Sequence, residues 1–163
     1  MRLGWLSAGA ALAIGLSLAL KLSVLGVTVE EDQPAALRDL RAALISQGYG
    51  VTIPRADLPI VRAERAGCAI TARVLDPHGI YRDTELLKLP QGWTVAYGWR
   101  GEWQDSLPRL GPLVEYYLAR QLARFGVGAR HAPVVMLSRA ADCALPGAAA
   151  LDIRVHLRRA AAD

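Results

Sequence analysis

Residues 3–20 read LGWLSAGAALAIGLSLAL, eighteen consecutive positions without a charged residue or a proline. As an α-helix this segment would be about 27 Å long, close to the ~30 Å of a bilayer's hydrocarbon core. Lys21 follows, and its four-carbon stem can carry the ammonium group to the lipid headgroups. The sequence therefore predicts one N-terminal transmembrane helix, with residues 1–29 as membrane anchor and exit segment.

The charges on either side of this segment predict its orientation. Arg2 and the amino terminus precede it, whereas the acidic residues 30–32 follow Lys21. The positive-inside rule then favours a cytoplasmic N-terminus. We expect an uncleaved signal-anchor of the bacterial inner membrane, with the remaining domain in the periplasm. Two alternatives stay open: a signal peptide cleaved near Val24-Leu25-Gly26, and a buried helix of a soluble protein.

The rest of the chain suits one domain of ordinary size, predicted to cover residues 30–159, with a disordered tail at 160–163. Beyond Lys21 there are 17 basic and 15 acidic residues, a net charge of +2. The basic residues are scattered arginines rather than a patch. This small, dispersed charge argues against a nucleic-acid partner.

Two cysteines, Cys68 and Cys143, are far apart in the sequence. Outside the cytoplasm, an even number of cysteines is compatible with one disulfide bond. Spacing alone does not show whether their Cα atoms come within about 7 Å, so two separate buried thiols remain the alternative.

Two segments have the spacing of amphipathic helices. The first begins at Gln33, after Asp32 as N-cap, and ends at Gly48. The second opens with Pro112 and ends at Gly126. Its large apolar residues are Leu110, Leu113, Val114, Tyr117, Leu118, Leu122 and Phe125. We expect both helices to cover one face of a sheet with their apolar sides.

Alternating or continuous apolar runs predict the β-strands. They are residues 49–53, 58–65, 68–75, 93–99, 133–137 and 151–158. The second and third are separated only by Ala66-Gly67, which predicts a β-hairpin, and the residues 76–79, Asp-Pro-His-Gly, match a type I turn. The predicted fold class is therefore α+β: a transmembrane helix followed by a two-layer sandwich of a mostly antiparallel sheet with two helices.

Motifs that would commit the chain to a chemistry are missing from the sequence. Its cysteines and histidines do not have the short spacings of zinc sites, and no serine lies in a G-x-S-x-G elbow. We predict no cofactor and no metal. Three carboxylates around the predicted turn, Asp76, Asp83 and Glu85, are the weak candidates for acid–base catalysis in a membrane-anchored hydrolase or transferase.

Recognition of a partner is the preferred hypothesis. Residues 93–103 contain three of the four tryptophans, with Arg100 and Glu102 beside them. Tryptophan and arginine anchor interfaces and stack on sugars, so Trp103, Arg100 and Glu102 are the predicted binding residues. Trp103 lies outside the strand alternation and is expected to be the exposed aromatic. The alternative for the strand aromatics is packing beneath the second helix.

The sequence thus favours a membrane-anchored accessory protein of the cell envelope whose outer domain binds another envelope protein or a polysaccharide. An anchored enzyme is one alternative. The other is a transmembrane subunit of a membrane complex. Small residues recur every four positions at Ser7, Ala11, Gly15 and Ala19, a spacing that allows a partner helix to approach closely.

Overall fold

The computed structural model describes residues 26–53, 60–75 and 89–161. Within them the chain forms β1 (Val29–Glu31), α2 (Gln33–Ser46), β2 (Gly50–Thr52), β3 (Ile60–Arg65), β4 (Cys68–Leu75), β5 (Trp93–Trp99), β6 (Glu102–Gln104), α4 (Leu110–Arg124), β7 (Ala129–His131), β8 (Val134–Ala140), the 3₁₀ helix η1 (Ala148–Leu151) and β9 (Val155–Arg159). None of the helices among these residues is both long enough and apolar enough to cross a bilayer. The predicted membrane segment, residues 3–20, lies outside the described ranges.

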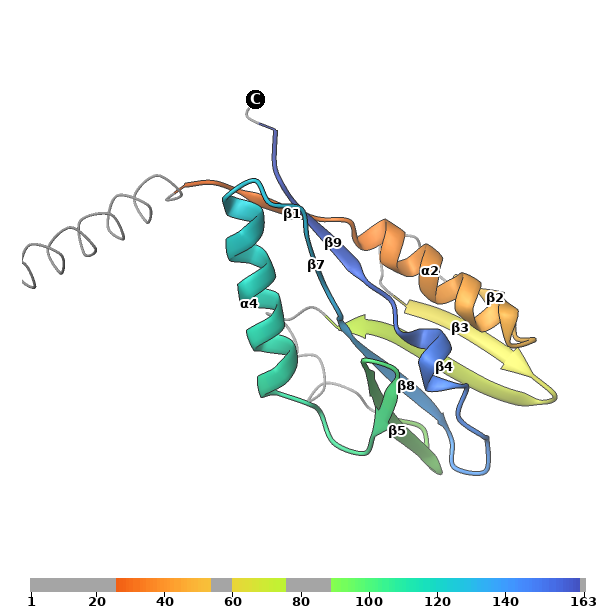
Figure 1. The fold of residues 1–163 in the computed structure, drawn as a ribbon. Helices are drawn as coiled ribbons and strands as arrows, with labels where there is room; N and C mark the ends of the chain where they lie inside the picture. Colours follow the sequence, from red (N-terminus) through yellow and green to blue (C-terminus); the bar gives the residue numbers. More distant parts are fainter. Residues whose placement is uncertain (1–25, 54–59, 76–88, 162–163) are drawn as a thin grey trace, which may run out of the picture.

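The strands form two antiparallel sheets. Six strands have the order β2-β3-β4-β8-β5-β6, and three have the order β1-β9-β7. The chain passes from β7 to β8 through Ala132 and Pro133, so one segment links the two sheets (Figure 1). The α+β class, the two helices and the antiparallel pairing are confirmed. The prediction of one sheet is wrong, because β9 pairs with β1 and β7 in a second sheet, and these two strands of three residues are too short for apolar alternation to reveal.

Helix α2 forms as the sequence predicts. The side chain of Asp32 accepts a hydrogen bond from the backbone N–H of Ala35 at 3.0 Å and so caps the first turn. Gly48 follows the helix with a φ of +82°, a conformation that glycine adopts without strain. Leu40 and Leu44 are fully buried between the helix, the six-stranded sheet and β9. This layer is the main hydrophobic core.

The hairpin of β3 and β4 is also confirmed. Arg65 pairs with Cys68, and the two residues between them, Ala66 and Gly67, both have positive φ, +51° and +78°. Positive φ at both central residues is the conformation of a type I′ turn, one of the two turns favoured in two-residue hairpin loops. Strand β8 then lies between β4 and β5 at the centre of the sheet, as expected for its continuous apolar sequence.

A disulfide joins Cys68, at the start of β4, to Cys143, in the loop after β8. Their Cα atoms lie 5.5 Å apart. The bond closes a loop between residues separated by 75 positions, and it ties the end of the β3–β4 hairpin to the segment that leads into η1.

Helix α4 packs on the three-stranded sheet with a different side from the one predicted. Its buried residues are Pro112, Tyr116, Ala119 and Ala123. The last three form a cluster with Ala129 and Leu157 of the sheet. The large apolar residues predicted to be buried are instead exposed, apart from Leu113, which is partly buried. Alanines let the helix backbone come close to the sheet, and this close packing decides which side is buried. The expected burial of the large side chains is therefore wrong.

Candidate functional site

The outer side of α4 is an exposed apolar surface, which we call the α4 face. It comprises Leu110, Val114, Tyr117, Leu118, Leu122 and Phe125, continued by Val127 after the helix. Their exposed fractions range from 48% to 77%. Contiguous apolar surfaces of this kind are uncommon on soluble domains and mark sites of interaction. The α4 face is the strongest candidate for a functional surface in the described part of the chain.

A groove runs along this helix on the side of β7. Its helical wall includes Val114, Leu118 and Leu122, and its other wall is formed by residues 128–130. Trp99 and Arg100, from the end of β5 and the turn that follows, close one end. The volume is about 650 Å³. A groove with apolar walls and small residues in its floor suits the insertion of side chains from another molecule.

The position of α4 next to this groove depends on a close contact at its first turn. The indole ring of Trp99 lies directly on Gly111, where an added Cβ would be 2.3 Å from the ring. Only a glycine permits this approach. The Trp99 ring therefore fills the space beneath the first turn of α4. For this residue the alternative prediction, packing beneath the second helix, is confirmed.

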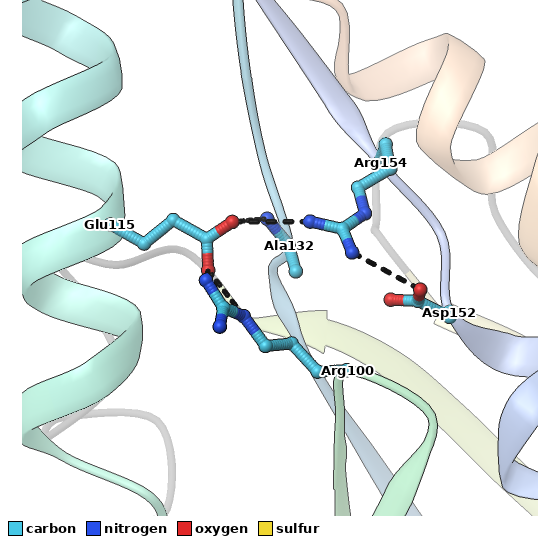
Figure 2. Close-up of polar contacts among 5 residues, drawn as sticks. All are labelled: Arg100, Glu115, Ala132, Asp152 and Arg154. Carbon is cyan, nitrogen blue, oxygen red and sulfur yellow. Dashed lines mark hydrogen bonds and ion pairs between the residues drawn. The ribbon is translucent and has the colours of Figure 1, made fainter.

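Glu115 joins α4 to three other parts of the fold (Figure 2). One oxygen, Oε2, accepts a hydrogen bond from Nε of Arg100 at 3.1 Å and forms an ion pair with Nη2 of the same residue at 3.0 Å. The other, Oε1, accepts from Nη1 of Arg154 at 3.1 Å and from the backbone N–H of Ala132 at 3.2 Å. Arg154 also contacts Asp152 at 3.1 Å. The carboxylate is largely buried, with 15% of its side chain exposed.

These contacts define what Glu115 can do. Two guanidinium groups balance its charge, and both of its oxygens already accept hydrogen bonds, so it acts as a link between elements rather than as a free base. The two arginines are half-exposed, and solvent screens their contribution to stability. The contacts of Glu115 position α4 against the β5–β6 turn, the end of β7 and the segment before β9.

His131 is a buried titratable group behind the groove. Its side chain is 1% exposed and lies edge-on to the Tyr116 ring, with centroids 5.2 Å apart. Burial lowers the pKa of His131 from its ordinary value of 6.5, while the nearby carboxylates of Glu31 and Glu115 act in the opposite direction. Its Nε2 lies 4.0 Å from Oε1 of Glu31.

The structure does not bring the three predicted binding residues together. Arg100 reaches α4 and lies at the end of the groove, and Glu102 is exposed on β6. Trp103 points to the other side of the hairpin, where its ring packs over Gly98 and against the main core. Its Nε1–H donates to the carbonyl of Pro146 at 2.7 Å. The expected exposure of Trp103 is wrong, because the short strand β6 turns the ring inward.

The weak catalytic candidates, Asp76, Asp83 and Glu85, lie outside the described residues, as do His78 and the predicted turn. Within residues 26–53, 60–75 and 89–161, no group of three His, Cys, Asp or Glu side chains is placed to hold a metal ion. His131 is buried and His156 is exposed on β9.

Two parts of the candidate site were missed in the sequence: the outward direction of the α4 face and the role of Glu115. The outward direction of the α4 face could have been predicted from one feature of the sequence. Ala119 and Ala123 are four positions apart, as on one side of a helix, and small residues at this spacing allow close packing. The contacts of Glu115 come from residues 15 to 39 positions away and leave no local pattern.

Comparisons with known proteins identify no relative. No protein-family model matches the chain, no curated protein matches it significantly, and no solved structure does either.

Proposed function

We propose that the chain is a single-pass, membrane-anchored accessory protein of the bacterial cell envelope, whose outer domain recognises another envelope protein through the α4 face. The exposure of seven large apolar side chains along α4 and the turn after it is the observation that carries this proposal. Burying them against a partner would remove apolar surface from water, which is the main driving force of association.

A protein partner suits this surface better than a polysaccharide. Sugars are bound by exposed aromatic rings with polar groups around them. Here Trp103 packs against the core and Trp99 packs beneath α4, whereas the exposed surface is mostly aliphatic. Aliphatic side chains next to a groove are typical of surfaces that receive the apolar side chains of another protein.

The position of α4 relative to the predicted anchor supports a partner close to the membrane. Strand β1 begins at Val29, nine residues after Leu20, and nine residues span at most ~30 Å. Val29 packs against the buried side of α4, and β1 passes the C-terminal end of this helix (Figure 1). A chain anchored by residues 3–20 would therefore hold the α4 face near the bilayer surface.

Co-purification of the full chain from mild detergent tests the proposal. Leu118→Glu places a charge in the middle of the α4 face, and it should reduce recovery of the bound protein at least tenfold. Ile45→Glu is the matched control, because Ile45 is a large apolar residue of α2 with 49% exposure. Equal recovery with both variants, or equal loss with both, contradicts the α4 face as the recognition surface.

A further inference from the structure

The outer edge of β7 carries backbone groups that point away from its sheet. Strand β7 ends the order β1-β9-β7, and among residues 26–53, 60–75 and 89–161 it pairs with β9 alone. Arg130 lies opposite His156 in that pairing. The carbonyl of His156 accepts from the N–H of Asp32, beside β1, so the backbone groups of His156 face away from β7. Arg130 and His156 are therefore a pair without mutual hydrogen bonds.

A second contact, on the α4 side of β7, also shows that the backbone groups of Arg130 point away from β9. The N–H of Ala132, two residues after Arg130, donates to Glu115 of α4 rather than to β9. Backbone groups two residues apart in an extended chain point the same way. The N–H and C=O of Arg130 therefore face the groove, where Arg130 is one of the lining residues. The free edge ends at Arg130, because the next outward N–H, that of Ala132, already donates to Glu115.

The dimensions of the groove suit an extended segment. From Leu110 to Leu122 the helical wall is about 18 Å long, and a strand of five or six residues covers that length at ~3.3 Å per residue. A strand paired with Arg130 would place every second side chain against Val114, Leu118 and Leu122. Backbone pairing combined with alternate apolar pockets is how domains bind a peptide by strand addition.

The charge around the groove selects the kind of segment. The charged residues that line the groove are Arg100, Glu115 and Arg130, a net charge of +1. Glu115 is already bonded to Arg100 and Arg154. A second copy of this chain would bring an equally basic surface, and like charges facing one another oppose such a contact.

We propose that the groove between α4 and β7 binds an extended, acidic segment of the partner protein, which adds to the edge of β7 as a fourth strand of the smaller sheet. The proposal rests on the proposed function and names the form and charge of what the α4 face recognises. Apolar side chains of the segment contact Leu118 and its neighbours, and its carboxylates lie next to the exposed Arg130.

A defined peptide tests this proposal with the full chain in a neutral, mild detergent. The probe is a synthetic eight-residue peptide of alternating valine and glutamate, and binding is followed by fluorescence anisotropy. We expect its Kd to be at least tenfold lower than that of the valine–lysine peptide. Hydrogen exchange at the N–H of Arg130, which does not donate to β9, should slow at least tenfold when the valine–glutamate peptide is bound.

Two substitutions separate the backbone from the side chain. Arg130→Pro removes the outward N–H without touching a hydrogen bond to β9, and it should weaken peptide binding at least tenfold. Arg130→Ala keeps the N–H and should weaken binding less than Arg130→Pro does. Unchanged thermal unfolding of both variants shows that the fold is retained. If a variant does not fold, the hydrogen-exchange measurement on the unmodified chain tests the proposal instead.

Three results would overturn strand addition: equal affinity for the two peptides, no effect of Arg130→Pro in a folded variant, or slow exchange at the N–H of Arg130 before any peptide is added. The last result would mean that the chain's own residues or a second copy already cover the edge. Slow exchange only on anionic lipid discs would assign the face to the bilayer. If recovery of the partner depends on Leu118 but not on the N–H of Arg130, strand addition fails and the proposed function stands.

Discussion

Substitutions on the two sides of α4 test the orientation of this helix, on which the candidate site depends. Leu118 is 61% exposed, and Ala119, the next residue, is 4% exposed. Fully burying a leucine side chain stabilises a protein by about 1.5–3 kcal/mol, and less than half of Leu118 is covered. Leu118→Ala should therefore lower the free energy of unfolding by about 1 kcal/mol or less.

The neighbouring position, Ala119, should be more sensitive to substitution, because a larger side chain there has no room. Ala119 lies in the contact of α4 with the sheet, where it packs with Ala123 and Leu157. Ala119→Leu inserts three carbon atoms into this contact and should lower the free energy of unfolding by about 1–3 kcal/mol. Urea denaturation of the full chain, followed by far-ultraviolet circular dichroism, measures both changes. Ile45→Ala, at an exposed position of α2, is the control for a small loss.

The opposite orientation predicts different values. If the large side chains of α4 were buried, Leu118→Ala would cost about 3–5 kcal/mol, as core leucines do. Ala119 would then be at the surface, and Ala119→Leu would change stability by less than about 0.5 kcal/mol. A loss at Leu118 that exceeds the loss at Ala119→Leu refutes the orientation and, with it, the exposed α4 face.

Three further predictions concern the rest of the fold. Replacing Cys68 and Cys143 together by alanine opens a loop between residues separated by 75 positions, and should lower the free energy of unfolding by about 4 kcal/mol in urea denaturation, an effect that reductant should reproduce in the unmodified chain. Gly98→Ala should destabilise the protein by about 1–3 kcal/mol, because the new Cβ would lie 2.9 Å from the Trp103 ring. Alanine normally suits a strand better than glycine, so a stabilised variant would contradict the packing of Trp103 on Gly98. The thermal midpoint and tryptophan fluorescence measure the change. Burial lowers the pKa of His131, so the unfolded chain binds a proton at this residue more readily than the folded chain does. The free energy of unfolding should therefore fall as the pH decreases below 6.5, towards the lowered pKa. His131→Leu should remove this part of the pH dependence, measured by unfolding between about pH 7.5 and 5.

Local patterns predicted the parts of the fold that local interactions determine. The cap of α2 at Asp32 and the two-residue hairpin turn at Ala66-Gly67 depend on residues a few positions apart, and both were predicted from the sequence. The strands β1, β6 and β7 have three residues each, too few for alternation to be recognised. The position of β8 between β4 and β5 depends on pairing across the chain, which no local pattern encodes.

The candidate site was less predictable for a physical reason. Helix α4 has apolar residues on two sides, small ones at Ala119 and Ala123 and large ones at Leu118 and Leu122. Hydrophobicity alone favours burial of the larger side, whereas the sheet accepts the helix only where its backbone can come close. Arg100 was predicted as a binding residue and lies at the groove, but its contact with Glu115 joins distant segments that only the folded chain brings together.

The central claim is that the α4 face is covered by a different protein in the cell. Site-specific photo-crosslinking in living cells measures this directly, with the photoreactive residue at position 118 and, as control, at position 45. We predict a discrete crosslinked product of higher mass from position 118, different from two linked copies of this chain, and none from position 45. No product from position 118, or a product with the mass of two copies, contradicts the claim.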